Sequence, residues 1–383
     1  MEELNKINYK KYKKLLPKIK IEKTIKIATV FSGIGAVEQA LERMGVKTKI
    51  IFACDNNKFV KKSYLANYNI DEKNWHYDIK DINGNLYQNK IDILVGGSPC
   101  QSFSSVGKRK GLNDDRGNLI YEFIRIVKET KPKIFIFENV KGLTTHNEGK
   151  TWKKIIIPEF EKLDYTLNFE ILNSKNYGIP QHRERLFLIG FKENKNFLFP
   201  KKIPLQLKVQ NLLEDNADEK YYLGRKGFEF VFNINKKRPS STQVNGEIAL
   251  CQRANQQFNW HGDFVLNYGP VNDKYFLSEA VKKYVLSIGT KNYKTKIKTN
   301  LEIARPLLSS MASMHRAGVD NYFMFGPKIR KLTPRECLRL MGFSDKFKIV
   351  VSDTQAYKQA GNSMVVDVLM HIFKQIFISM KWK

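Results

Sequence analysis

The sequence predicts an α/β fold in which a parallel sheet carries helices on both faces. Over residues 25–198, short apolar runs alternate with amphipathic helical patterns. The apolar runs are nearly continuous, as expected for strands that are buried on both faces. A glycine-rich turn joins the first run to the first helix, as in doubly wound sheets that bind nucleotide-like ligands.

The individual elements follow from these patterns. Val37, Ala40, Leu41 and Met44 recur at helical spacing, and Gly45 is a natural stop for that helix. Two more helices are expected at 119–130 and 152–163, the latter kinked at Pro158. The predicted strands are 25–31, 49–55, 92–97, 133–140, 166–172 and 185–191.

The chain divides into four parts by composition. Residues 1–24 form a basic extension, whose simplest interpretation is a solvated tail. Residues 25–198 form the α/β domain, and 199–329 form a basic, aromatic module without clear periodicity. Regular patterns return in 330–383, a segment that we expect to rejoin the α/β domain.

Charge and composition point to the class of partner. The 383 residues are 42% hydrophobic, which suffices for a large core, and the formal net charge is +28. Such an excess attracts polyanions, with nucleic acid as the first candidate and an anionic membrane surface as the second. A bias towards Lys, Asn and Ile, as in AT-rich genomes, accounts for part of this charge.

Two further classes of protein are disfavoured. No apolar run approaches the roughly 20 residues that span a bilayer, and no apolar stretch follows the basic start as in a secretory signal. The cysteines are scattered without CxxC spacing, which argues against zinc and against a disulfide framework and fits a reducing compartment. They are Cys54, Cys100, Cys251 and Cys337.

The turn "FSGIGA" is a candidate ligand site. Gly33 and Gly35 permit a tight turn and a close approach at a helix N-terminus, although a plain turn is an equal alternative. Asp55 ends the next strand about 20 residues later, where a carboxylate binds ribose hydroxyls in such folds. Its alternative role is a helix N-cap, and Asp78 is a weaker candidate of the same kind.

Cys100 stands where a strand meets a loop. It follows "DILVGGSP", and Pro99 restricts the backbone just before it. The next residues are small, polar and basic, as in a mobile loop that closes over a phosphate backbone. We therefore interpret Cys100 as a nucleophile, with a buried structural cysteine as the alternative.

Three more charged residues fall near strand ends. Glu138 ends an apolar strand, which suits a general acid or a helix N-cap. Arg183 and Arg185 are two residues apart at a strand entry and so share one face, where they would hold an anion or a carbonyl-rich ligand. Glu184 faces the other way as a surface charge, and His182 has no partner that suggests a metal.

Six motifs, taken in order, resemble the DNA (cytosine-5)-methyltransferase family. They are the glycine turn, the acidic strand end, Pro-Cys-Gln, Glu-Asn-Val, Gln-x-Arg-x-Arg and the late "QAYKQAGNSMVVDV". The match covers about residues 25–198 and 328–383 and is closest to the bacterial restriction–modification type. The resemblance implies a Rossmann-like class I methyltransferase domain with a smaller, irregular target-recognition domain at 199–329. Its cofactor would be S-adenosylmethionine and its substrate double-stranded DNA.

The resemblance also implies roles for single residues. Cys100 would add to carbon 6 of a flipped-out cytosine, Glu138 would bind N3 and the exocyclic amine, and Arg185 would bind O2. Arg183 would support Glu138 or the thiolate. The cofactor would be bound by Phe31, Gly33, Ile34, Gly35, Asp55, Asp78, Ile79, Pro99, Leu119, Asn362 and Ser363, with no metal.

The chain departs from the family pattern at three places. Asn56 follows the ribose carboxylate where an aromatic residue is usual, which weakens or reorients adenine stacking. Residues 306–309 read Pro-Leu-Leu-Ser where the family has Pro-Thr-Leu-Thr, and the basic N-terminal extension is longer than usual. Base-reading side chains are expected in 199–329, especially in "CQRANQQFNWHGDF".

Other functions compete with this interpretation. An RNA cytosine-5 methyltransferase is the nearest alternative, although a large module between the motifs favours sequence-specific DNA. A nonenzymatic DNA-binding protein and a nicotinamide-dependent dehydrogenase are more distant alternatives. The expected setting is the bacterial cytoplasm, associated with the nucleoid, as a monomer without membrane contact and with a cognate restriction endonuclease as a separate partner.

Overall fold

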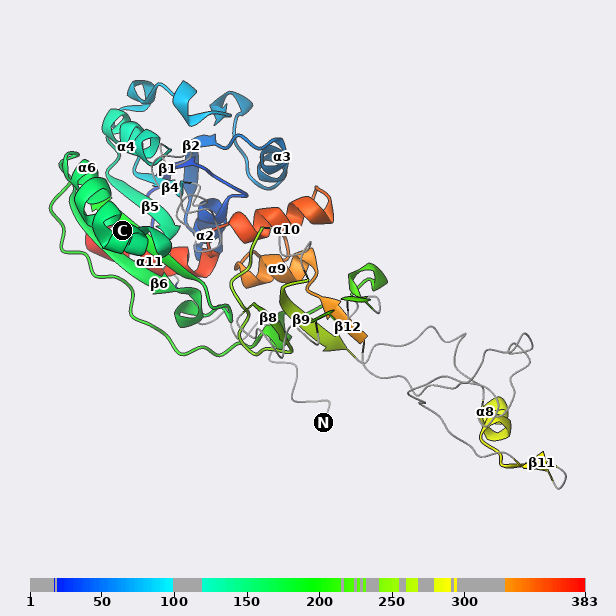
Figure 1. Cartoon of the computed structure of the whole chain (residues 1–383). Coiled ribbons are helices and arrows are strands. Elements are labelled where there is room, and N and C mark those ends of the chain that lie inside the picture. Colours follow the sequence, from blue (N-terminus) through cyan, green and yellow to red (C-terminus); the bar gives the residue numbers. More distant parts are fainter. Residues whose placement is uncertain are drawn as a thin grey trace.

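Figure 1 shows the computed structural model, which is built around a seven-stranded sheet of order β3-β2-β1-β4-β5-β7-β6. The structure describes residues 17, 19–98, 119–214, 217–223, 226–227, 230–231, 241–254, 260–267, 279–290, 293–294 and 328–382. The strands of the sheet are β1 (Ile25–Val30), β2 (Thr48–Cys54), β3 (Trp75–His76), β4 (Ile93–Gly96), β5 (Ile134–Val140), β6 (Thr166–Asn173) and β7 (Glu184–Phe191).

The sheet is mixed, which corrects the expectation of a uniformly parallel one. β1 to β5 pair in parallel, whereas β7 runs antiparallel to both β5 and β6. The link from β6 to β7, residues 174–183, contains only a short 3₁₀ turn. A parallel neighbour needs a crossover of about a dozen residues or more, so this link favours the antiparallel pairing.

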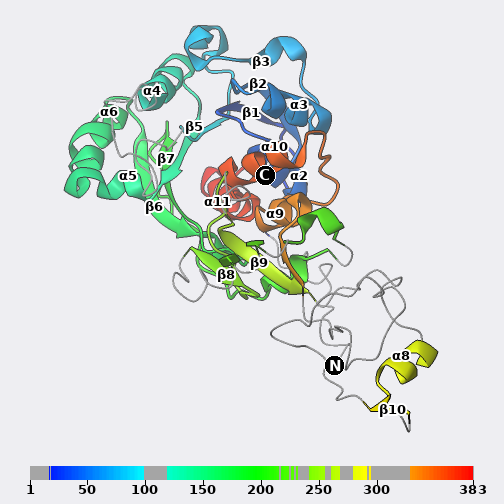
Figure 2. The same ribbon diagram turned by 45° about the vertical axis from the view of Figure 1, so that its right-hand side comes forward.

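Helices cover both faces of the sheet, as predicted. Side chains of β5 alternate between two cores: Ile134 and Ile136 face one, and Phe135 and Phe137 face the other. Helices α2 and α11 fill the first core, and α4 and α6 fill the second (Figures 1 and 2). Their bounds are α2 Ala36–Met44, α4 Leu119–Thr130, α6 Ile157–Glu161 and α11 Val366–Met380.

Helix ends follow the local sequence signals. Gly45 caps α2 in the left-handed conformation with φ 75°, as predicted. Pro158 lies in the first turn of α6, directly after a π-helical turn at Thr151–Ile156. Where a kink was expected, the helix therefore changes from π-helical to α-helical hydrogen bonding. Thr333 begins α9 (Pro334–Leu340) with a reciprocal capping pair to Glu336.

The segment beyond residue 198 packs closely on the α/β domain. Val209, Leu212 and Tyr221 are buried in the same core as α11. A three-stranded sheet of order β12-β9-β8 follows, whereas α8 (Glu279–Val285) lies apart from the rest of the described chain in both views (Figures 1 and 2). The strands are β8 Thr242–Val244, β9 Gly262–Asn267 and β12 Lys328–Lys331.

The end of the basic extension is not a solvated tail. Ile21 is buried, and the Lys23 ammonium forms a 2.8 Å ion pair with Asp92. The same ammonium lies 4.6 Å from the ring centroid of Trp382 near the C-terminus. The interpretation as a tail is therefore wrong for the last residues before β1, because Ile21 joins the core and Lys23 binds two distant partners.

The C-terminal helices supply the most apolar segment of the described chain. Asp353–Met380 has the length and hydropathy of a membrane span, but 67% of its most apolar window is buried inside the protein. The segment also contains a helix end at Asn362, and Asp367 in α11 forms a 2.7 Å ion pair with Arg43 of α2. This burial identifies α11 as a core helix, which packs against the sheet.

Candidate functional site

A cavity of about 330 Å³ opens at the sheet edge where β1, β2, β4 and β5 end. β1 pairs with β2 on one side and with β4 on the other, so the order of the strands reverses at β1. Ligands of doubly wound sheets bind at such a topological switch point. Ser363 borders a smaller adjoining pocket. The predicted residues that line the main cavity are Phe31, Gly33, Ile34, Asp55, Asp78, Ile79, Leu119, Glu138, Arg183, Arg185 and Asn362.

The glycine turn forms one wall of this cavity. Gly33 has φ 53° and donates its main-chain N–H to Asp55 Oδ2 at 3.0 Å. Gly35 lines neither pocket in the described chain; a Cβ there would lie 2.1 Å from Tyr68 Cε2. The Tyr68 hydroxyl also donates to the Gly35 carbonyl at 2.8 Å. Gly33 therefore shapes the cavity, while Gly35 permits close packing behind it.

Asp55 keeps capacity for a ligand. Its two carboxylate oxygens each accept one main-chain N–H, from Gly33 and from Asn57, both at 3.0 Å. A carboxylate has about four acceptor positions, so both oxygens can still accept hydroxyl groups. Burial raises the pKa of Asp55, and the two N–H groups oppose that rise. Asn57, and not Asp55, is the N-cap of the next helix.

Asp78 has a more local contact. Its Oδ1 accepts the Lys80 main-chain N–H at 3.0 Å and so caps a short 3₁₀ turn. Ile79, the first residue of that turn, is buried against the second core. The two residues place a polar and an apolar group on the same stretch of the cavity wall.

Glu138 and Arg185 meet on the opposite side of the cavity. Arg185 Nε lies 3.3 Å from Glu138 Oε1. Burial raises the pKa of Glu138, and the positive charges of Arg185 and Arg183 oppose that rise only in part. The pair arises because β5 and β7 are antiparallel neighbours: the end of β5 lies beside the start of β7, with Val140 opposite Arg185.

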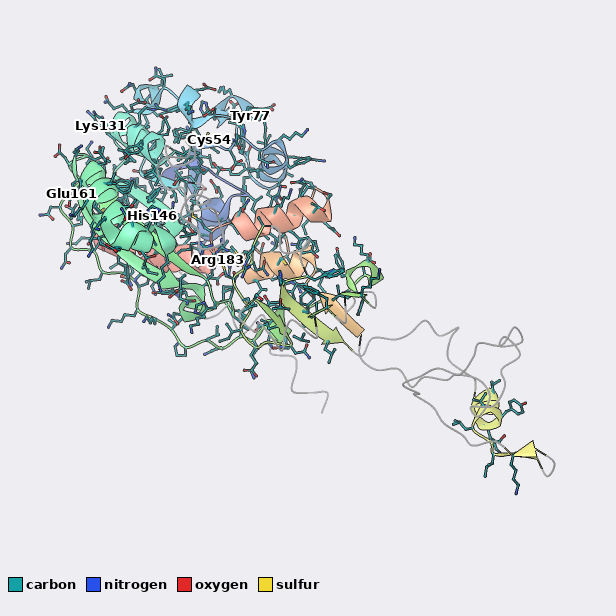
Figure 3. The ribbon with its side chains drawn as sticks, in the orientation of Figure 1. Cys54, Tyr77, Lys131, His146, Glu161 and Arg183 are labelled. Atoms are coloured by element: carbon teal, nitrogen blue, oxygen red, sulfur yellow. The ribbon has the colours of Figure 1, made fainter. Side chains whose placement is uncertain are left out.

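Arg183 makes a different set of contacts. It is 3% exposed and donates to the carbonyls of Gln252 at 3.0 Å, Gly361 at 3.1 Å and Ser363 at 2.9 Å. It thus ties the entry of β7 to the loop before β9, to the end of α10 (Asp353–Asn362) and to Ser363 between α10 and α11; Arg183 is labelled in Figure 3. Sequence spacing alone contained no signal for these contacts.

Replacing Arg183 by lysine is expected to destabilise the fold. An ammonium cannot reach the three main-chain carbonyls in their separate directions, so we expect the free energy of unfolding to fall by about 2–3 kcal/mol. Urea denaturation measures this change. Arg185→Lys is the matched control, because lysine keeps the positive charge that pairs with Glu138, and the carbonyl that Arg185 contacts belongs to its own neighbour Glu184. Equal stability of the two variants would contradict the structural role of Arg183.

The start of the cysteine loop is held firmly. Gly97 and Ser98 follow β4 and line the cavity. Buried Asn139 donates its side-chain amide to the carbonyl of Ser98 at 3.3 Å and to its hydroxyl at 3.1 Å. Pro99 and Cys100 lie outside the described residues. Asn139 is a positioning residue that the sequence interpretation missed, although it is part of the Glu-Asn-Val motif.

The three described cysteines differ in their surroundings. Burial raises the pKa of the Cys54 thiol to about 12, and Cys337 is buried in the core. Burial also raises the pKa of Cys251, but nearby Arg183 and Arg185 outweigh it and lower that pKa overall. Cys251 Sγ lies 3.7 Å from Arg183 Nη1 and 4.0 Å from Arg185 Nη2. The sequence interpretation did not single out Cys251, because a lone cysteine carries no motif.

Helix α10 closes the cavity from the C-terminal part of the chain. Gln355, Lys358 and Gln359 line it together with the predicted Asn362. Gln359 is held by Ser63 Oγ at 2.9 Å and by the Phe59 carbonyl at 3.0 Å. These α10 residues could not be found from sequence patterns, because their position depends on packing between helices about 300 residues apart.

The chain matches known proteins over most of its length. The model of the C-5 cytosine-specific DNA methylase family matches residues 25–378. Type II methyltransferase M.SsoII of Shigella sonnei is 33% identical over 361 residues, which cover 91% of this chain and 78% of the relative. Type II methyltransferase M.HhaI of Haemophilus parahaemolyticus is 31% identical over 363 residues, which cover 94% and 96%.

Solved structures share the fold at low identity. The Entamoeba histolytica methyltransferase EhMeth has a TM-score of 0.64 at 17% identity, with 94% of this chain and 99% of that chain covered. A putative DNA modification methyltransferase encoded within a prophage of E. coli has a TM-score of 0.56 at 21% identity, with 94% and 100% covered. The predicted Rossmann-like class I methyltransferase fold is therefore confirmed.

Proposed function

Because the chain belongs to the C-5 cytosine-specific DNA methylase family, and so is a DNA cytosine-5 methyltransferase of the bacterial restriction–modification type, we propose a specific route for its reaction. The methyl donor is S-adenosylmethionine, and the acceptor is a flipped-out cytosine that is bonded through carbon 6 to Cys100. The observation that carries this proposal is Glu138, a buried carboxyl with a raised pKa beside Arg185, in the same cavity as Asp55.

Glu138 and Arg185 suit the base. A carboxyl with a raised pKa keeps its proton to higher pH, so it can donate a hydrogen bond to N3 of cytosine while its other oxygen accepts from the exocyclic amine. The Arg185 guanidinium stabilises the negative charge that develops on O2. Both groups withdraw electrons from the ring and so prepare carbon 6 for attack.

Cys100 supplies the nucleophile. β4 ends at Gly96, and Gly97 and Ser98, the two residues that precede Pro99 and Cys100 in the sequence, line the cavity. The thiolate forms a bond to carbon 6, and the ring electron pair moves to carbon 5. Carbon 5 then takes the methyl group as the methyl–sulfur bond of the donor breaks, and that bond's electron pair stays on sulfur as a neutral thioether. Loss of the carbon 5 proton to a base and expulsion of the thiolate restore the ring.

The cavity residues fit a nucleoside donor. Asp55 offers free acceptor positions for two hydroxyls, while Phe31, Ile79 and Leu119 supply apolar surface. Asn362 and Ser363 close the side towards α11, and Pro99 would join the wall. When bound, the donor supplies an electrophilic methyl group on a positively charged sulfur. Arg183 holds the loop at Gln252 and the segment at Gly361 around this space.

The target base must leave the helix to reach Glu138, because enzymes that modify a base extrude it from the stack. The net charge of +28 favours tight, salt-dependent binding to the phosphate backbone.

We assign sequence recognition to residues 199–329. We also propose that the enzyme is a monomer in the bacterial cytoplasm, near the nucleoid, and that a separate cognate endonuclease accompanies it. RNA is disfavoured because the matching family model is specific to DNA.

DNA that carries 5-fluorocytosine at the target position should trap the covalent step. Fluorine at carbon 5 cannot leave as a proton does, so the bond to the cysteine persists after methyl transfer. We expect an adduct that survives SDS and migrates as a protein–DNA complex, formed only with the methyl donor present. Bisulfite sequencing of methylated plasmid identifies the target cytosine beforehand. The absence of any adduct on a verified target would contradict the covalent route.

A further inference from the structure

We propose that Tyr77 provides the aromatic surface on which the adenine of the methyl donor stacks, an inference that rests on the proposed donor. The position of Tyr77 follows from strand pairing. β3 lies parallel to β2, with His76 opposite Cys54, and the Asp55 N–H donates to the His76 carbonyl at 3.1 Å. Asp55 and Tyr77 therefore leave two neighbouring strands at the same level, and both line the cavity; Figure 3 labels Tyr77 and Cys54, the last residue of β2.

Tyr77 is not used for packing the core. It is 50% exposed and lines the cavity, whereas Trp75, two residues earlier, is buried with Val60 and Tyr64. An exposed aromatic face on a cavity wall is suited to a flat ring. Asn56 lines the same cavity, but its amide offers no aromatic face.

The Tyr77 ring is held in place by charge. The Lys61 ammonium lies 4.9 Å from the ring centroid and forms a 2.8 Å ion pair with Glu72. A cation over an aromatic ring attracts it and restrains its rotation. The ring is thus partly ordered before a ligand binds, which lowers the entropic cost of stacking.

The chemistry of a nucleoside connects the two neighbouring residues. Asp55 offers acceptors for ribose hydroxyls, and the base is attached directly to that ribose. The side chain that leaves the adjacent strand at the same level is Tyr77. Stacking of a base on an aromatic side chain is sequence-tolerant and strong enough to be measured by alanine substitution.

Calorimetric binding of S-adenosylhomocysteine to the DNA-free protein tests this proposal. We expect Tyr77→Ala to raise the Kd by about tenfold, equivalent to about 1.4 kcal/mol, and Tyr77→Phe to leave it within about twofold. Tyr77→Leu, which keeps apolar volume without an aromatic face, should weaken binding like alanine. Phe59→Ala is the matched control: Phe59 is 36% exposed beneath Lys58 but does not line the cavity.

The outcomes separate this inference from the proposed function. If the wild-type protein binds the ligand and Tyr77→Ala or Tyr77→Leu binds it equally well, the stacking role is refuted while the donor remains. If the wild-type protein itself fails to bind the ligand, the donor assignment fails as well. Thermal melting without ligand shows whether each variant is folded, and a loss seen equally with Phe59→Ala would also overturn the specific role of Tyr77.

Discussion

Methyl transfer by Cys100→Ala is expected to fall by about 10⁴-fold or more, while binding to DNA stays close to that of the wild type. Without the sulfur no bond forms to carbon 6, so carbon 5 of cytosine never becomes electron-rich enough to take the methyl group. Alanine removes only one small side-chain atom and leaves the charges that bind the phosphates unchanged. Transfer of a labelled methyl group and a gel-shift titration measure the two quantities.

Cys251→Ala is the decisive control for this prediction. Cys251 is the described thiol whose pKa is lowered by arginines, and it lies near Arg185 and therefore near Glu138. If Cys251→Ala keeps activity and forms the 5-fluorocytosine adduct while Cys100→Ala does neither, the nucleophile is Cys100. If Cys251→Ala is inactive and Cys100→Ala is not, the nucleophile has been assigned to the wrong residue.

Glu138→Gln is expected to slow methyl transfer by about 10²–10⁴-fold with little change in DNA binding. An amide can still donate a hydrogen bond, but it cannot share a proton with N3 as the ring becomes electron-rich. Single-turnover kinetics with saturating DNA isolate this step. Glu184→Gln is the matched control, because Glu184 is the neighbouring carboxylate that pairs with Lys141 at 3.1 Å. Equal rates for both variants would remove Glu138 from the mechanism.

The pH dependence supplies a second test of Glu138. Its pKa in the folded protein is raised by burial, so the neutral, active acid is present below that pKa and is lost as pH rises through it. The wild-type rate should decline on this alkaline side, and the residual rate of Glu138→Gln should not. The pKa of Glu138 is higher in the folded than in the unfolded protein. Its contribution to the free energy of unfolding is therefore also lost as pH rises through the folded pKa.

Much of the fold could be predicted from local patterns. The apolar spacing of α2 with Gly45 at its end, and the alternation of Ile134 to Phe137 between two cores, depend on neighbouring residues alone. So does the placement of Asp55 and Glu138 at strand ends, where parallel strands bring them to one edge. The glycine turn could also be predicted, because the positive φ of Gly33 is a local backbone conformation that depends on the residue being glycine.

Other features depend on contacts between distant segments. The sequence predicted a parallel sheet, but β7 pairs antiparallel with β5, and this pairing brings Arg185 to Glu138. Arg183 binds the Gly361 carbonyl, 178 residues away, and no local pattern contains that partner.

By itself, the sequence predicted the strands β1, β2 and β4 to β7, a polyanionic partner and the chemical groups at the strand ends, since periodicity, charge and side-chain identity are local properties; it did not predict β3. Only the tertiary structure decided which of those groups meet. It assigned Gly35 to packing against Tyr68, Arg183 to main-chain carbonyls and Tyr77 to the cavity wall beside Asp55. The physical reason is that burial, pKa and hydrogen-bond partners depend on neighbours in space, which the pairing of distant strands and helices selects.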